Sequence, residues 1–230
     1  MRKILCHHFI LLFLYAGFFV PMNTYAEEKP NEFVYLKSWA PTIQEEVRYY
    51  TANNFIGRPI QGYLNPVCLL TKKAANALLS IQNTLSEKNL GLRVFDCYRP
   101  QMAVDDFFQW SQNPQDQKMK NAYYPHINKA DLFTLNYIAR RSGHTRGSTV
   151  DLTLVDLKTN EPLDMGTPFD FMDPLSHPSC RKITIKQFHN RMLLRRIMMT
   201  FGFSPLKTEW WHFTLKDEPY KNTYFNFPLA

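Results

Sequence analysis

The chain has 230 residues, of which 45% are hydrophobic and 15% aromatic, and its formal net charge is +7 at pH 7. This composition excludes a disordered chain, and the length suits one compact core. The basic residues are scattered along the chain, and the one dense group, Arg191, Arg195 and Arg196, falls in a helical pattern. A nucleic-acid-binding surface is therefore not expected.

Residues 1–26 have the layout of a secretory signal peptide. Two basic residues precede an apolar run over 9–20, and the segment ends in Thr24-Tyr25-Ala26. The apolar run is shorter than the ~20 residues that span a bilayer as a helix, although an uncleaved membrane anchor is the alternative. We expect residues 27–230 to form the mature domain, without a stable membrane span, in the periplasm or outside the cell.

Three cysteines follow this segment, namely Cys68, Cys97 and Cys180. An exported location permits disulfides, and an odd number leaves at least one thiol free. Their spacing does not match a zinc knuckle. We expect Cys68 to pair with Cys97, because both flank segments that look like core elements.

The first half of the chain predicts a helix, a strand and a second helix. The segments are, in chain order, an extended lead-in over 27–50, a turn-rich stretch over 53–66, a helix over 71–89, a strand over 90–98, a helix over 100–110 and a long loop over 113–132. Thr71 can cap the first helix, and Pro100 suits the first turn of the second.

The second half predicts a short helix over 131–141, a strand over 148–155, an irregular stretch over 157–180, a helix over 184–203 and a last strand over 209–215. Gly202 is expected to end the long helix. Helices and strands mix without a regular βαβ alternation. We therefore expect an α+β fold in a single domain, with a mainly antiparallel sheet flanked by helices.

Polar residues on the strands expected over 148–155 and 209–215 suggest a functional site. Side chains alternate along a strand, so Asp151 lies on the face opposite the apolar core of strand 148–155. His144 precedes Asp151 by seven residues, and a bend at Gly147 would bring the two together. His212 lies on the polar face of strand 209–215, and Glu209 precedes it. If the two strands are neighbours, these side chains meet.

Two histidines and one carboxylate suit Zn²⁺, and three protein ligands leave a position for water, as in catalytic sites. The metal would lower the pKa of that water to about 7. Glu209 is the candidate general base, and Arg99 the candidate partner of the oxyanion. Each residue also has a simpler interpretation: the His144–Asp151 pair as a surface histidine and a cap, and Arg99 as a salt-bridge partner of Asp96.

Five blocks of the sequence carry a family resemblance. They are DCYRP (96–100), SGHTRGSTVDLTL (142–154), MGTPFDFMD (165–173), EWWHF (209–213) and DEPYKNTYFNFP (217–228). In this order they resemble the zinc D-Ala-D-Ala peptidases of the VanX type, the D-alanyl-D-alanine dipeptidases, over roughly residues 35–230. The resemblance implies the hedgehog-like fold of that family.

The resemblance also implies roles for individual residues. It implies one Zn²⁺ per chain on His144, Asp151 and His212, with Glu209 activating the zinc-bound water, Arg99 stabilising the tetrahedral intermediate, Ser142 lining the pocket, Asp170 holding the substrate's amino group, and Tyr49 or its neighbour Tyr50 lining the pocket. Two positions depart from the family pattern: Thr149 replaces an alanine and is expected to face the site, and Cys97 replaces a glycine.

The expected activity is hydrolysis of D-Ala-D-Ala to two D-alanines by an exported zinc enzyme. One alternative is a D,D- or L,D-carboxypeptidase that acts on longer muropeptides, and another is a non-catalytic, zinc-stabilised binding module. The expected partner is D-Ala-D-Ala or a related cell-wall peptide, and no protein partner is implied. The signal segment favours salvage of D-alanine from the cell wall over intracellular vancomycin resistance.

Overall fold

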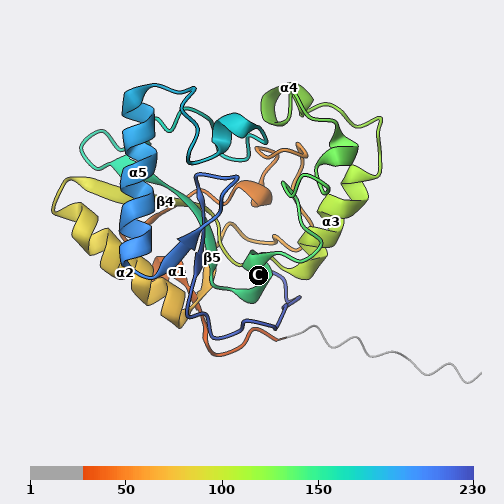
Figure 1. Cartoon of the computed structure of the whole chain (residues 1–230). Helices are drawn as coiled ribbons and strands as arrows, with labels where there is room; N and C mark the ends of the chain where they lie inside the picture. Colours follow the sequence, from red (N-terminus) through yellow and green to blue (C-terminus); the bar gives the residue numbers. More distant parts are fainter. Residues whose placement is uncertain (1–27) are drawn as a thin grey trace, which may run out of the picture.

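A five-stranded mixed sheet forms the centre of the structure, a computed structural model that describes residues 28–230 (Figure 1). In spatial order its strands are β2 (Gln44–Glu45), β4 (Leu90–Asp96), β5 (Thr149–Asp156), β7 (His212–Leu215) and β6 (Phe203–Pro205). Only the β2–β4 pair is parallel. The expected α+β fold with a mainly antiparallel sheet is confirmed. The predicted signal peptide lies outside the described residues.

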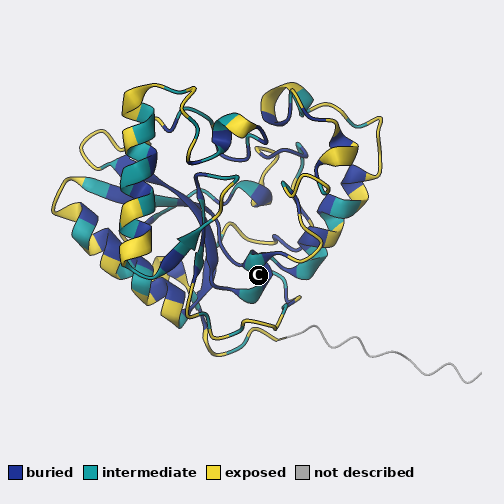
Figure 2. Ribbon diagram, in the orientation of Figure 1, coloured by how far each residue is buried: buried dark blue, intermediate teal, exposed yellow. Residues whose placement is uncertain are grey.

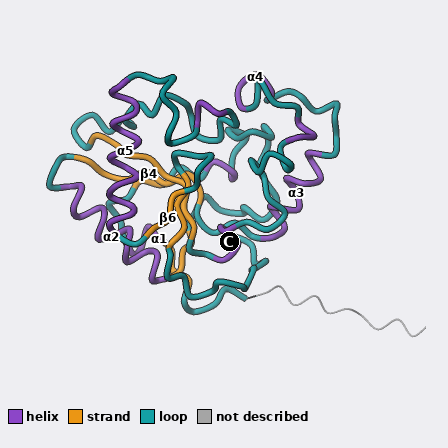
Figure 3. The backbone as a smooth tube through the Cα atoms, viewed as in Figure 1, coloured by secondary structure: helices purple, strands orange, loops and turns teal. Residues whose placement is uncertain are grey.

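The helices and loops divide between the two sides of this sheet. The helices are α1 (Leu36–Trp39), α2 (Lys72–Ser86), α3 (Gln101–Ser111), α4 (Lys120–Tyr123) and α5 (Ile185–Thr200). In Figure 1, α2 and α5 lie together on one side, while α3 and α4 lie on the other. Figure 3 shows that long loops make up most of this second side. Among the described helices, none is long and apolar enough to cross a membrane.

A small second sheet pairs β1 (Phe33–Tyr35) with β3 (Leu69–Thr71). Within residues 27–50, where an extended lead-in is expected, the structure has β1, α1, β2 and a 3-10 turn at Arg48–Tyr50. Such short elements form because they pair with distant segments, and their own sequences are too short to show a period.

The helix ends follow the predicted signals. Thr71 accepts a hydrogen bond from the backbone N–H of Ala74 at 3.4 Å. Thr184 and Gln187 form a reciprocal capping box at the start of α5. The helix is followed by Gly202, whose φ of +90° is the left-handed conformation that glycine adopts readily.

Two expectations about local structure are wrong. The stretch over 131–141 is a series of turns and bends after a 3-10 turn at Lys129–Asp131. Asn136 has a φ of +60°, which is incompatible with a continuous α-helix. The loop expected over 113–132 contains α4.

The polar face of β5 is buried, contrary to the expectation that it lies outside the core. Asp151 is 2% exposed and Thr153 is 1% exposed, because the loop-rich side of the molecule covers them. Figure 2 shows the central strands as buried, with exposed surface on the outer faces of α2 and α5. Charged groups on this face are therefore shielded from water and interact strongly with one another.

Candidate metal centre and active site

The strand register places two of the three candidate ligands, Asp151 and His212, side by side. β5 and β7 are antiparallel neighbours, and Asp151 lies directly opposite His212. His144 reaches the same point from a 3-10 turn, Gly143–Arg146, which ends at Gly147. Gly147 has a φ of +81°, and a Cβ there would lie 2.3 Å from the ring of Phe33. A glycine is therefore required at the turn that brings His144 back towards Asp151.

The three side chains form a compact cluster. Nε2 of His144 lies 3.2 Å from Oδ2 of Asp151, and Nδ1 of His212 lies 3.0 Å from Oδ1 of Asp151. The two imidazole nitrogens are 3.3 Å apart. Bonds of about 2.0–2.1 Å from one tetrahedral Zn²⁺ place its ligand atoms about 3.3 Å apart. The distance between the two imidazole nitrogens matches one edge of such a tetrahedron, and one ligand atom from each of the three residues lies within 4.8 Å of the others.

One oxygen of Asp151 supports the same conclusion. Oδ1 is buried and has no hydrogen-bond partner among the described residues, because the nearby ring nitrogen of His212 is not aligned with it. Burial opposes ionisation of Asp151, but His144 and His212 hold the pKa of its carboxyl below its usual range. A buried carboxylate with a free lone pair fits a cation ligand.

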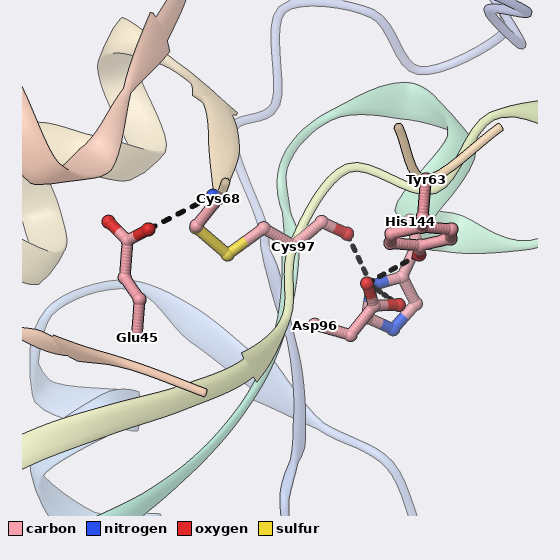
Figure 4. The surroundings of a disulfide bond; sticks show 6 residues. All are labelled: Glu45, Tyr63, Cys68, Asp96, Cys97 and His144. Atoms are coloured by element: carbon pink, nitrogen blue, oxygen red, sulfur yellow. Dashed lines mark hydrogen bonds and ion pairs between the residues drawn. A yellow bond between two sulfur atoms is a disulfide. The ribbon is translucent and has the colours of Figure 1, made fainter. Parts of the chain in front are cut away.

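A second layer of contacts orients His144 (Figure 4). Its Nδ1 lies 2.7 Å from the carbonyl oxygen of Cys97. A carbonyl can only accept, so Nδ1 carries the proton and Nε2 presents its lone pair to the cluster. Asp96 lies 3.5 Å from the same Nδ1 and accepts a hydrogen bond from Tyr63 at 2.6 Å. These partners fix both the ring orientation and the tautomer.

A disulfide between Cys68 and Cys97 joins the end of β4 to the residue before β3 (Figure 4). The bridge closes a loop with a sequence separation of 29 residues. Cys180 is the free cysteine among the described residues. The bridge therefore fastens the backbone of Cys97, whose carbonyl orients His144.

Reduction of this bridge is expected to lower the free energy of unfolding by about 3–4 kcal/mol, from the loop-closure entropy of a loop of this length. Urea denaturation of a Cys180→Ser variant, with and without reductant, measures the effect of the bridge alone. Superimposable unfolding curves would contradict the prediction.

Glu209 lies next to the three-residue cluster. Its Oε2 is 3.6 Å from Nδ1 of His212, and the side chain is 13% exposed. Burial, and then the Asp151 carboxylate, raise the pKa of Glu209 to about 8. A divalent cation beside it would lower that pKa and favour the carboxylate. Glu209 is thus a titratable group within reach of a water bound in the cluster.

Arg99 follows β4 and occupies the other side of the cluster. Its Nε and Nη2 lie 2.9 Å and 2.8 Å from Oδ2 of Asp96, and Nη2 is 3.6 Å from Oδ2 of Asp151. The guanidinium also lies over the rings of Tyr49 and Phe107, at 5.0 Å and 5.1 Å from their centroids. The alternative salt bridge to Asp96 is therefore present, and it holds Arg99 beside the cluster.

Arg99, Glu209 and the three residues of the cluster line one cleft with a volume of about 270 Å³. Tyr49 is in the cleft and donates a hydrogen bond from its hydroxyl to Oδ2 of Asp170 at 2.9 Å. Tyr50, the other candidate for the tyrosine that lines the pocket, is 37% exposed. Burial and the Asp151 carboxylate raise the pKa of Asp170 well above its usual range. Ser142 also lines the cleft, and its hydroxyl accepts a hydrogen bond from the N–H of His144 at 3.2 Å.

One expectation about the residues that line the cleft is wrong. Thr149 does not line the cleft; its hydroxyl lies 2.9 Å from that of Thr214. Trp211 is buried and is also part of the cleft lining. Sequence reasoning missed Tyr63, which donates to Asp96, because a single tyrosine in a turn-rich stretch forms no pattern. Phe107 follows the helical spacing of α3, but spacing alone does not identify the cavity it faces.

The fold and the site define a class: an α+β protein with a His-Asp-His metal centre and a buried glutamate, as in metal-dependent hydrolases. Comparison with known proteins gives the family. The chain matches the M15 peptidase family described as D-Ala-D-Ala dipeptidase over residues 29–230, and it belongs to that family. Zinc dependence is typical of this family.

Relatives support this assignment over nearly the whole of their own lengths. A D-alanyl-D-alanine dipeptidase of Streptomyces coelicolor is 44% identical over 200 residues, which cover 87% of this chain and 99% of that protein. One from Enterococcus faecalis is 42% identical with the same coverage. One from Escherichia coli is 34% identical over 185 residues, which cover 80% of this chain and 85% of that protein.

Proposed function

We propose that the protein hydrolyses D-Ala-D-Ala to two molecules of D-alanine, with one Zn²⁺ held by His144, Asp151 and His212. The observation that carries this proposal is the convergence of these ligand atoms, all within 4.8 Å of one another, beside Glu209 in a small cleft. The names of the relatives support the choice of substrate.

The residues around the cluster supply the acid–base and electrostatic parts of the reaction. Bound Zn²⁺ supplies Lewis acidity and lowers the pKa of a coordinated water to about 7. The carboxylate of Glu209 accepts a proton from the attacking water and then passes it to the nitrogen of the leaving D-alanine. The guanidinium of Arg99 lies where it can stabilise the negative charge that develops on the peptide oxygen.

Asp170 in the cleft lining suits the free amino group of a dipeptide. Asp170 is 6% exposed and accepts a hydrogen bond from Tyr49. An ammonium group placed against Asp170 would stabilise the ionised carboxylate, because opposite charges attract strongly in a buried site. The volume of about 270 Å³ lies just below the usual range of about 300–1,000 Å³ for ligand pockets. Both features favour a dipeptide over a longer muropeptide.

Release of D-alanine tests the activity and its dependence on metal. Purified protein is expected to release D-alanine from D-Ala-D-Ala, to lose this activity after treatment with a chelator, and to regain it with added Zn²⁺, because two histidines and one carboxylate converge as they do in catalytic zinc sites. L-Ala-L-Ala and N-acetyl-D-Ala-D-Ala serve as comparison substrates. Absence of turnover by zinc-loaded protein would rule out catalysis and favour the binding-module alternative, and faster cleavage of the acetylated substrate would favour the carboxypeptidase.

We also propose that the protein acts in the periplasm or outside the cell. The support is the basic, then apolar, then small-residue pattern of residues 1–26. N-terminal sequencing of protein from cell fractions tests this: a start at residue 27 in the exported fraction is expected, and a full-length cytoplasmic chain would overturn it.

A further inference from the structure

Arg191 is a buried arginine on the face of α5 that packs into the protein. It is 1% exposed, and its hydrogen bonds go to a set of backbone carbonyls and one hydroxyl, with no carboxylate among these partners. The partners are the carbonyls of Met165 at 2.6 Å, Leu175 at 2.8 Å and His177 at 3.0 Å, and the hydroxyl of Thr167 at 3.4 Å. A charged group in such a place requires an explanation, because its burial is costly.

All these partners belong to one segment, residues 165–177, which we call the strap. Arg191 binds the strap near both of its ends and so closes it into a loop. Hydrogen bonds within the strap also join its two ends. The hydroxyl oxygen of Thr167 lies 2.9 Å from that of Ser176, and Ser176 donates to the carbonyl of Phe171 at 2.5 Å. The indole of Trp210 donates to Thr167 at 2.9 Å. The strap is therefore fixed to α5 and to the residues that precede β7.

The middle of the strap carries Asp170 into the cleft. Phe169 packs against Phe95 and Trp211, with ring centroids 4.8 Å and 5.5 Å apart. Asp170 has a φ of +62°, a left-handed conformation that is uncommon for a residue other than glycine. Such a conformation persists only where the surrounding contacts impose it. The position of the carboxylate thus depends on how firmly the strap is held.

Residues of the strap line two hollows. Asp170 and Met172 line the 270 Å³ cleft, while residues 165–169 line a second hollow of about 510 Å³. Arg48 and Arg93 also line this second hollow. The strap therefore borders both the cleft and a space into which a longer substrate could extend.

We propose that Arg191 is a positioning residue: by closing the strap it sets the position of Asp170 in the cleft and so makes a free amino group necessary for good substrates. This inference rests on the proposed dipeptidase function and on Asp170 as the acceptor of the amino group. Lysine cannot replace the planar fork of guanidinium donors that binds several carbonyls at once.

The test compares two substrates in the variant Arg191→Lys. The kcat/KM ratio of D-Ala-D-Ala to N-acetyl-D-Ala-D-Ala is expected to fall about tenfold to a hundredfold, because a displacement of about 1 Å at a substrate contact has effects of this size. The change is expected mainly in KM for D-Ala-D-Ala, with Zn²⁺ affinity unchanged. Arg196→Lys, on the exposed face of the same helix, is the matched control and is expected to leave the ratio unchanged.

A double-variant cycle separates positioning from general stabilisation. If Arg191 acts through Asp170, the selectivity of Arg191→Lys with Asp170→Asn equals that of Asp170→Asn alone. A lower melting temperature with an unchanged substrate ratio would overturn the proposal and leave Arg191 a purely structural residue. If Arg191→Lys does not fold, Thr167→Val removes the three hydrogen bonds of the Thr167 hydroxyl and is expected to shift the ratio in the same direction.

Hydrogen exchange gives a reading that does not depend on activity. Amides of residues 165–177 are expected to exchange faster in Arg191→Lys, while those of β5 keep their protection. Unchanged exchange in the strap would overturn the inference even in an active enzyme. A zinc-loaded wild type that cleaves neither substrate would instead overturn the proposed function, whatever the exchange of the strap.

Discussion

Replacing Glu209 with glutamine is expected to lower kcat for D-Ala-D-Ala by about 10²–10⁴-fold, the usual contribution of a general acid–base group. Glutamine keeps the size and the hydrogen-bonding capacity of the side chain but cannot take up a proton from water. Zn²⁺ binding is expected to persist, because the ligand atoms come from His144, Asp151 and His212. The expected result is therefore a protein that contains metal and is almost inactive.

The measurement combines D-alanine release with the zinc content of the same purified sample. Glu161→Gln makes the same chemical change at an exposed position and is expected to behave as wild type. Full activity of Glu209→Gln would remove Glu209 from the proton transfer. Loss of bound zinc together with activity would instead assign Glu209 a part in holding the metal.

Much of the site could be predicted because two local patterns coincide with long-range pairing. Alternation along residues 148–155 and 209–215 placed Asp151 and His212 on the faces opposite the apolar side chains. Register then brings them into direct opposition. The need for a turn at Gly147 also followed from the seven-residue separation of His144 and Asp151. The sequence does not show that the two strands are neighbours; the strand order, in which β5 is adjacent to β7, does.

Other features depend on contacts that no local pattern contains. β2 has two residues and exists because it pairs with β4. The polar face of β5 is buried because loops from elsewhere in the chain cover it, so alternation could identify that face but not its burial. The strap has no regular structure beyond a 3-10 turn at Pro174–Ser176, and its position depends on Arg191. The sequence pattern of α5 placed Arg191 only in a charged helical cluster.

Replacing Arg99 with methionine is expected to reduce both catalysis and stability. Loss of a donor to the developing oxyanion is expected to lower kcat/KM by about 10²–10³-fold. The side chains of Asp96 and Asp151 are 0% and 3% exposed, and both face Arg99. Removal of the guanidinium takes away the hydrogen bonds to Asp96 and a positive charge beside both buried carboxylates, so the free energy of unfolding of the metal-free protein is expected to fall by about 3–5 kcal/mol.

Bound metal separates these two effects of Arg99. A divalent cation held by His144, Asp151 and His212 would compensate the charge of Asp151 but not that of Asp96, so the stability loss is expected to be smaller in zinc-loaded protein. Urea denaturation with and without Zn²⁺ measures this difference. The control is Arg58→Met, which breaks the ion pair with Asp106 outside the cleft; Arg58 is 43% exposed, so a loss of about 0–1 kcal/mol is expected. Equal losses for both arginines would show that the charge of Arg99 is not required to compensate the buried carboxylates.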